Sequence, residues 1–508
     1  MIEEDKLKLG PLTADKLPGS SPQTGKLVLL VALPALQVAI HLPYLRLPFH
    51  WDEVGQFVPA ALDIYRGGHW VPQRTLPNVH PPGVMAILAL VWRIFGFSIL
   101  SSRLTMLAIA ALGIALCFVL TLRLTGGKRT PALAATLFLI AAPIFYTQSM
   151  MALLDMPAMT FTLLALLLFL DRRYLLCSCA CALAVLMKET AITTPVVFAA
   201  WLWLKERKRR EALYFVLPAL ALGAWLLALH GATGRWLGNE EFAQFNVSSA
   251  LNPYHLGFAI LARLWFLFVA DGHFIGTIAL FVGWRLLRGS EWRIALLVAS
   301  AQVAVVTVFG GAELERYLVP ALPVLYAAMA AAACAYAPGW RWVSYASMLA
   351  CLVAGWFWST PSPWPYEDNL DMVDFVRLQQ SAADYLQEHA AAARILTAWP
   401  LSDNLQYPEM GYVTRPLKAL KAPGLHLNEI AGMGRDNFDV LVMFTNKRPV
   451  KGSLLDVRPL QGFLRYYYDY EPQASVDEIR EGIGFVPVKR WQRGDQWMEI
   501  YVPRARLR

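Results

Sequence analysis

A chain of 508 residues in which 57% of residues are hydrophobic and only 16% are charged has too few charges to cover the surface of a soluble protein of this size. Its mean hydropathy of +0.42 indicates an α-helical protein that crosses a membrane many times. The net charge of +8 comes from short basic clusters between apolar segments rather than from one basic groove, so nucleic acid is not an expected partner.

Apolar runs near the length that crosses a bilayer, about 20 residues, recur along the chain. Eleven of them predict transmembrane helices, at residues 27–45, 101–122, 131–149, 156–170, 174–187, 190–204, 211–230, 272–288, 292–310, 317–337 and 341–358. With the tail 1–26 in the cytoplasm, most Lys and Arg of the loops fall on the cytoplasmic side, as the positive-inside rule requires. An odd number of spans then places the C-terminus outside. We expect a multi-pass protein of the cell (inner) membrane with its membrane domain at 27–358.

The first outer loop, residues 46–100, is long but not polar. Residues 82–96 within it are as apolar as a short transmembrane helix but too few to span, so we expect a helix that lies in the membrane interface. Residues 62–66 predict a second short helix.

After the last span the composition changes. Charge rises, Pro-rich residues 360–365 predict a linker, and no later run could cross a bilayer. Residues 359–508 are enough to bury a core of their own. Helical spacing of apolar residues predicts a helix at 371–389, and β-rich runs predict strands at 394–399, 439–444 and 497–502. We expect an extracytoplasmic α/β domain.

Candidate chemistry begins with the adjacent acids Asp52 and Glu53, just beyond the first span. A charge at the bilayer centre costs about 2.5 to 3.5 kcal/mol, so both are expected at the outer surface, where they resemble the start of an active site. The alternative is that Asp52 only caps a helix beginning at Glu53. His80 precedes Pro81, Pro82 and Gly83; the prolines stiffen the chain and would hold His80 near the same surface, although a plain turn explains the prolines equally well.

Further candidate residues lie in two later loops on the outer side of the membrane. Asp155 lies between the third and fourth spans, where an ordinary helix start is the alternative reading. Lys188 and Glu189 lie in the tight turn between the fifth and sixth spans. A cation held there is a good phosphate contact, and an ion pair between these two neighbours is the alternative.

The last candidates precede the tenth span, where Glu313, Glu315 and Arg316 come before Tyr317. A helix N-terminus carries partial positive charge and free N–H groups, so Arg316 there could bind an anion. Arg316 could instead extend to lipid headgroups. All these candidates fall on the same predicted face.

The order of the motifs resembles the polyprenyl-phosphate-sugar-dependent glycosyltransferases of the family 39 type. These include protein O-mannosyltransferases, lipid A aminoarabinose transferases and related bacterial membrane glycosyltransferases. The similarity covers roughly residues 30–330 and rests on Asp52-Glu53, His80-Pro81-Pro82-Gly83, Arg103 entering the second span, Asp155, Lys188 and Arg316-Tyr317 with spaced prolines.

The resemblance implies a GT-C fold and transfer of a sugar from a polyprenyl-phosphate donor to a lipid, glycan or protein acceptor. In that family the first acidic residue of the loop is the implicated base, which corresponds to Asp52 here. Aminoarabinose transferases have an acid–Lys pair before their Pro-Pro, whereas this chain has Val79 and His80. Their sugar and acceptor therefore do not carry over.

Reaction chemistry gives the same assignment. A lipid phosphate, with a second pKa of about 6, leaves without an acid to protonate it, so the site needs a base for the acceptor hydroxyl and cations for the phosphate. Asp52 would take the proton while the hydroxyl attacks from the face opposite the phosphate, which inverts the anomeric centre. Glu53 would orient Asp52 or the acceptor. The expected substrate contacts are His80, Arg103, Asp155, Lys188, Glu189, Arg316 and Tyr317.

No cofactor is certain from the sequence, and the candidate is a divalent metal ion held by Asp52, Glu53 and His80. The main alternative function is a lipid or sugar transporter or flippase. That class predicts inverted repeats, broken helices or charges near the bilayer midplane, whereas we find no convincing repeat and the acids lie at span ends.

Overall fold

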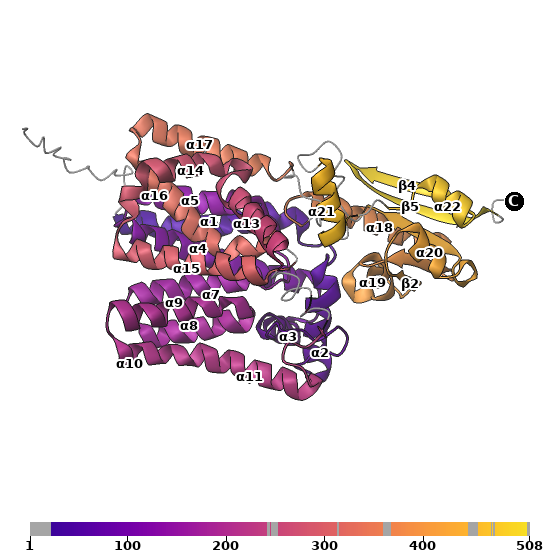
Figure 1. Cartoon of the computed structure of the whole chain (residues 1–508), viewed down its shortest axis with the longest axis horizontal. Coiled ribbons are helices and arrows are strands. Elements are labelled where there is room, and N and C mark those ends of the chain that lie inside the picture. Colours follow the sequence, from indigo (N-terminus) through magenta and orange to yellow (C-terminus); the bar gives the residue numbers. More distant parts are fainter. Residues whose placement is uncertain are drawn as a thin grey trace, which may run out of the picture.

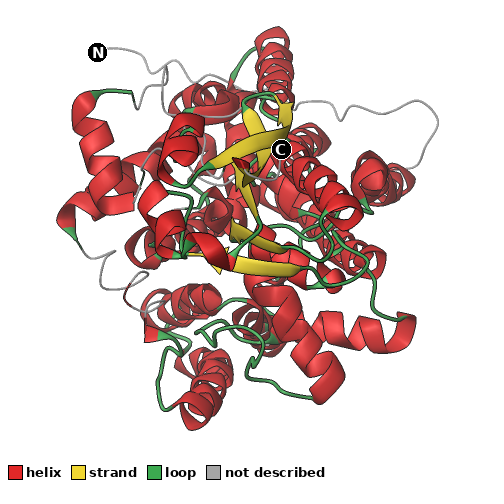
Figure 2. Ribbon diagram, turned by 90° about the vertical axis from the view of Figure 1, so that its right-hand side faces the viewer, coloured by secondary structure: helices red, strands yellow, loops and turns green. Residues whose placement is uncertain are grey.

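The computed structural model describes residues 22–240, 252–311, 314–358, 367–445, 456–468 and 473–504, together with residues 244 and 470. Helices dominate, and the strands gather in one small sheet near the C-terminus (Figures 1 and 2). The predicted linker 360–365, most of the tail 1–26 and Glu313 lie outside the described residues.

The long helical part holds all the predicted spans. Its α-helices are α1 (Pro22–His41), α2 (Val58–Gly67), α3 (Gly83–Phe95), α4 (Ile99–Leu124), α5 (Arg129–Ala141), α6 (Pro143–Gln148), α7 (Asp155–Leu170), α8 (Tyr174–Met187), α9 (Thr193–Ala200), α10 (Arg209–Ala212), α11 (Val216–Thr233), α13 (Pro253–Phe268), α14 (His273–Gly283), α15 (Ser290–Phe309), α16 (Leu322–Ala332) and α17 (Pro338–Ala354). Each of the eleven predicted segments is largely helical.

Within the described part of the chain, length and composition identify five helices able to cross a membrane, and a sixth if a bent pair counts as one span. The five are Gly25–Tyr44, Ile99–Leu124, Arg209–Thr233, Ser290–Phe309 and Glu315–Ala335. Helices α3, α5, α7 and α8 are apolar but shorter. The chain is therefore a multi-pass helical membrane protein, and the number of eleven spans stays a prediction.

Helix α13 was not predicted from the sequence. Arg263 interrupts its apolar run, which is also too short to span alone. Helices α13 and α14 bend by 43° at a break, where Asp271 has a φ of 52°. A search for continuous apolar runs does not find α13 because α13 and α14 form a pair of short helices that is bent at a break.

Both helices expected in the first outer loop are present. α3 occupies the apolar run at 82–96, and α2 is longer than the predicted 62–66. Gly83, which ends the His-Pro-Pro-Gly motif, lies so close to α8 that a Cβ there would be 2.4 Å from the Leu186 carbonyl oxygen. The glycine thus lets α3 begin directly against the end of α8, two residues before Lys188.

The C-terminal part confirms the predicted α/β composition. It contains α18 (Asp371–His389), β1 (Arg394–Ala398), α19 (Leu401–Gln406), β2 (Lys418–Ala422), α20 (Leu427–Gly432), β3 (Val440–Phe444), α21 (Arg458–Tyr468), α22 (Val476–Gly482), β4 (Phe485–Arg493) and β5 (Gln496–Pro503). The strand order is β2-β1-β3-β5-β4, with β1 parallel to β2 and β3, and β5 antiparallel to β3 and β4.

The sequence missed the two edge strands, β2 and β4. Both carry exposed basic residues, as edge strands often do to discourage pairing with other chains. Their apolar pattern is correspondingly weak, whereas the central strand β3 is buried throughout and was predicted.

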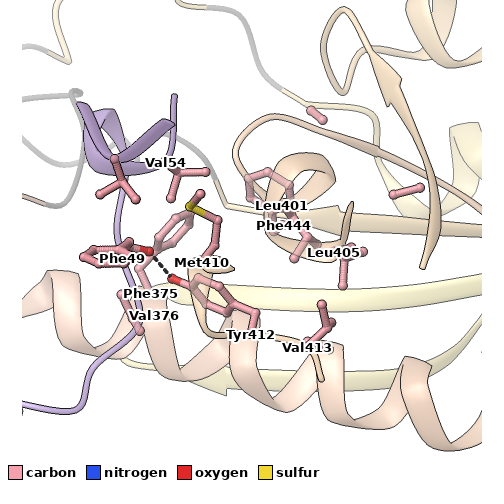
Figure 3. Close-up of a cluster of buried hydrophobic side chains, with 14 of the residues drawn as sticks. Phe49, Val54, Phe375, Val376, Leu401, Leu405, Met410, Tyr412, Val413 and Phe444 are labelled. Atoms are coloured by element: carbon pink, nitrogen blue, oxygen red, sulfur yellow. Dashed lines mark hydrogen bonds between the residues drawn. The ribbon is translucent and has the colours of Figure 1, made fainter. Parts of the chain in front are cut away.

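The sheet domain packs on the segment that precedes Asp52. The Phe49 amide donates to the Met410 carbonyl at 3.1 Å, and the Tyr412 hydroxyl donates to the Phe49 carbonyl at 2.9 Å. Figure 3 shows Phe49 and Val54 facing Phe375 of α18 in this cluster. One hydrophobic core therefore joins the first outer loop to the C-terminal domain, at one end of the helical part (Figure 1).

Candidate active site

The backbone around Asp52 is irregular. Trp51 has a φ of 52°, an uncommon conformation for a bulky residue, and a π-helical turn, Glu53–Phe57, follows Asp52. Such features cluster at functional sites. The Trp51 ring meets Trp399 of the C-terminal domain edge-on, with centroids 4.8 Å apart, so the domain supports the strained residue beside Asp52.

Glu53 points away from Asp52 into the protein. Its two carboxylate oxygens lie 2.5 and 3.0 Å from the Arg103 guanidinium, and they also accept from the amides of Ala152 at 2.6 Å and His50 at 2.9 Å. The side chains of Glu53 and Arg103 are fully buried. Arg103 further donates to backbone carbonyls of Pro48 and Met150. Neither side chain is open to a substrate in this geometry, contrary to our expectation; the pair instead fixes the loop to α4.

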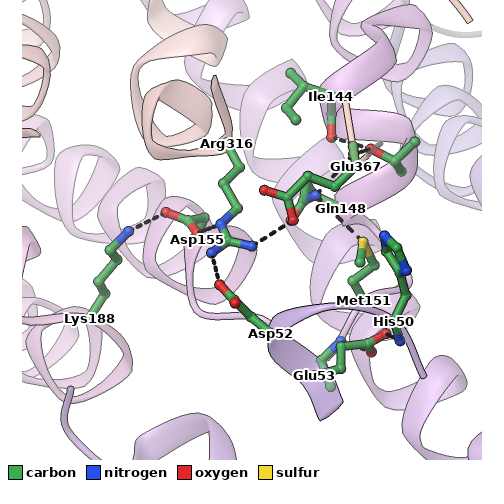
Figure 4. Close-up of polar contacts among 12 residues, drawn as sticks. His50, Asp52, Glu53, Ile144, Gln148, Met151, Asp155, Lys188, Arg316 and Glu367 are labelled. Carbon is green, nitrogen blue, oxygen red and sulfur yellow. Dashed lines mark hydrogen bonds and ion pairs between the residues drawn. The ribbon is translucent and has the colours of Figure 1, made fainter. Parts of the chain in front are cut away.

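Asp52 faces a different set of charges. Its carboxylate, 22% exposed, pairs with Arg316, whose Nη1 also lies 2.8 Å from a Glu367 oxygen. The Arg316 Nε is 3.6 Å from Asp155, and Asp155 accepts from Lys188 Nζ at 2.6 Å. Figure 4 shows this chain of ion pairs, in which three carboxylates share two cations.

The structure bears on the alternative readings of these residues. Asp52 makes no side-chain capping hydrogen bond at the start of the π-helical turn. Asp155 is the first residue of α7, as an ordinary helix start predicts, and its carboxylate in addition pairs with Lys188. Arg316 is only 4% exposed and surrounded by carboxylates, so it does not extend to lipid headgroups. Lys188 pairs with Asp155 rather than with its neighbour Glu189, which lies 2.9 Å from His80 Nδ1.

A cavity of about 260 Å³ adjoins this network. Its polar end is formed by His80, Lys188, Glu189 and Tyr317, and Lys188 Nζ lies 4.0 Å from the centre of the Tyr317 ring. Its apolar walls include Leu222 and Leu226 of α11 together with Val305, Val306 and Phe309 of α15. The cavity thus joins an apolar compartment to a cation.

Two residues near the network were not singled out from the sequence. His50 is fully buried, its ring edge-on to Phe375 with centroids 5.6 Å apart, and burial, with the nearby Arg103 charge, lowers its pKa to about 3, so the ring is neutral. Glu367 follows the Pro-rich linker. Burial raises its pKa to about 8 although Arg316 acts in the opposite direction. Acids after a linker, here Glu367 and Asp368, carry no sequence signal of this kind.

The site offers no obvious metal centre. Among the residues that the structure describes, no three His, Cys, Asp or Glu side chains come together as a metal site would require. In particular, the set Asp52, Glu53 and His80 does not converge, because Glu53 is engaged by Arg103 and His80 by Glu189.

The architecture is that of the GT-C glycosyltransferases. Crystal structures of ArnT from Cupriavidus metallidurans have the same fold. The form bound to undecaprenyl phosphate aligns with a TM-score of 0.56 and 15% sequence identity, covering 94% of this chain and 98% of ArnT. The apo form aligns with a TM-score of 0.57 and 16% sequence identity, with the same coverage of both chains. A cryo-EM structure of the arabinofuranosyltransferase AftD from Mycobacteria gives a TM-score of 0.42 at 14% identity, covering 93% of this chain and 39% of AftD.

The sequence adds a local match. Residues 79–231, from the residue before His80 to the last turn of α11, match the family model described as dolichyl-phosphate-mannose-protein mannosyltransferase. No curated protein matches the sequence. The chain is thus a membrane protein of GT-C fold that resembles polyprenyl-phosphate-dependent glycosyltransferases.

Proposed function

We propose that the chain is a membrane glycosyltransferase that moves a sugar from a polyprenyl-phosphate carrier to an acceptor hydroxyl at the outer face of the membrane. The observation that carries the proposal is the cavity between α11 and α15, because it pairs apolar walls with Lys188 next to the Asp155–Arg316–Asp52 network. The lipid chain, the phosphate and the catalytic base would then occupy neighbouring parts of one site.

The donor would bind with its isoprenoid chain along the apolar walls and its phosphate near Lys188 and Tyr317. Lys188 is a suitable phosphate ligand because its ammonium is buried and already oriented by Asp155. His80, which also lines the cavity, would face the phosphate as well. The undecaprenyl phosphate bound to ArnT supports this class of ligand.

Asp52 would act as the general base. It is the partly exposed member of the acidic pair, so an acceptor hydroxyl can reach it, and Arg316 would orient its carboxylate. Removal of the hydroxyl proton accompanies attack at the anomeric carbon from the side opposite the phosphate, which inverts the configuration. Glu53 and Arg103 are positioning residues that hold the Asp52 loop.

The proposed topology has eleven spans. The segments are α1, α4, α5 with α6, α7, α8, α9, α10 with α11, α13 with α14, α15, α16 and α17. The N-terminus is then cytoplasmic, the membrane domain covers 27–358, and the domain 359–508 is extracytoplasmic. In support, α2, α3 and the sheet domain lie at the same end of the helical part (Figure 1), and Trp51, beside Asp52, contacts Trp399 of the sheet domain.

Asp52→Asn provides the test. With purified full-length protein and a radiolabelled polyprenyl-phosphate sugar, the variant should lose about 10²- to 10⁴-fold in transfer rate, the usual contribution of a general base, while it still binds the donor. Asp374→Asn, which alters a half-exposed acid on α18, is the matched control.

Undiminished transfer by Asp52→Asn would exclude the base assignment. Movement of the lipid across the membrane without release of polyprenyl phosphate would identify the protein as a flippase instead.

A further inference from the structure

The charge network has no free cation for a phosphate. One Arg316 nitrogen contacts Asp52, another contacts Glu367 at 2.8 Å, and Nε faces Asp155. Lys188 is engaged by Asp155 at 2.6 Å. The neighbouring pair of Glu53 and Arg103 is neutral as a whole.

With all its groups ionised, this network carries three negative and two positive charges. A lipid phosphate is close to a dianion above its second pKa of about 6. The entry of this phosphate into a buried site of net negative charge is unfavourable unless one of the three carboxylates becomes neutral or moves out of the network.

The surroundings single out Glu367. Asp52 must stay ionised to act as the base, and Asp155 is held by both cations. Among the residues the structure describes, the Glu367 carboxylate forms an ion pair only with Arg316, and its Oε1 is buried without a hydrogen-bond partner. It also belongs to the segment leading into α18, not to a membrane helix.

We propose that Glu367 carries a proton whenever the donor phosphate is bound, so that Arg316 can share its charge with the phosphate. The proposal rests on the proposed function and adds a residue that couples phosphate binding to proton uptake. Thr147 and Gln148 of α6 hold the Glu367 backbone carbonyl, which keeps the residue in place while its carboxyl changes charge.

The groups that face Glu367 favour its neutral form. Burial is the largest influence and raises the pKa of Glu367 to about 8; Arg316 opposes it, while Asp52, Asp368 and Asp155 add to it. A phosphate near Arg316 would add negative charge and raise the pKa further. Binding at a pH near or above this pKa then requires a proton from solution.

The test measures binding of undecaprenyl phosphate to the full-length protein in nanodiscs by calorimetry. From about pH 7 to about pH 9 the phosphate stays dianionic. Wild-type affinity should fall about tenfold across this range, as expected for one group of pKa near 8. Near the upper limit, the binding heat measured in two buffers of different ionisation enthalpy should reveal uptake of nearly one proton.

Glu367→Gln mimics the protonated side chain. Its affinity should be independent of pH in this range and should match the wild-type value at the lower limit, with no proton uptake. Glu409→Gln is the control, because Glu409 pairs with Arg66 at the surface of the C-terminal domain, and it should behave as the wild type.

An equal fall in affinity for wild type and Glu367→Gln, or the absence of proton uptake by the wild type, would overturn the inference. The wild-type heats decide the matter even if the variant does not fold. If undecaprenyl phosphate fails to bind wild type at any pH, the proposed function fails and this inference with it.

Discussion

Glu53→Gln is expected to destabilise the protein far more than loss of a surface charge. The substitution leaves the Arg103 guanidinium fully buried without its counter-charge, and removal of one partner from a buried ion pair typically costs about 3–5 kcal/mol. Glu53 also accepts from the amides of His50 and Ala152. The glutamine NH₂ group must therefore face a donor, which adds about 1–3 kcal/mol for an unsatisfied group.

The assay is thermal unfolding of purified protein in detergent, followed by loss of the monodisperse peak. Glu409→Gln serves as the control, because Arg66 and Glu409 are 41% and 23% exposed and such surface pairs contribute at most about 1 kcal/mol. The double variant Glu53→Gln/Arg103→Met should recover part of the loss, since it removes the unpaired charge. A Glu53→Gln protein as stable as the wild type but inactive would refute the positioning role and indicate a part in the chemistry.

Three further expectations concern the donor site and its surroundings. Lys188→Ala should weaken binding of undecaprenyl phosphate about 10- to 100-fold, the value of one charged hydrogen bond, and unchanged affinity would remove Lys188 from the phosphate site. Gly83→Ala should lower the stability measured by thermal unfolding by about 1–3 kcal/mol, because the new Cβ would meet the Leu186 carbonyl oxygen at 2.4 Å. Gly223→Ala is the control, because a Cβ there would have nothing within 4 Å. Equal melting temperatures of the two variants would contradict the close approach of α3 and α8. The pKa of Glu367 is raised from 4.5 to about 8, so the folded state holds this proton more tightly than the unfolded state, and stability should decline as pH rises through that interval. Glu367→Gln should show a smaller decline in melting temperature. Parallel pH profiles for the variant and the wild type would contradict the raised pKa of Glu367.

Apolar periodicity and composition predicted most of the helices and strands of the fold. Helix α18 begins and ends at the predicted residues, and the buried strand β3 was recognised from its continuous apolar run. Periodicity failed where burial is one-sided or interrupted. The edge strand β4 is largely exposed, and α13 contains a buried Arg263 that only the folded neighbours accommodate.

The candidate site divides in a similar way. The sequence brought Asp52, Asp155, Lys188 and Arg316 to one face through the positions of span ends, and the structure joins them by direct contacts. It could not distinguish the orientations of adjacent residues. Asp52 and Glu53 are neighbours along the chain, yet the irregular turn at Trp51 directs them to different arginines.

The contact of Trp399 with Trp51, and of Glu367 with Arg316, also affects how the protein is made. Asp52 leaves the ribosome early, whereas both of these partners are translated only after α17, the helix that closes the helical part. A nascent chain with every span inserted therefore still lacks the groups that shape the Asp52 loop and balance Arg316. Competence for the reaction arises only when the C-terminal domain has been synthesised and folded against that loop, so a truncated product would occupy the membrane without consuming the donor lipid.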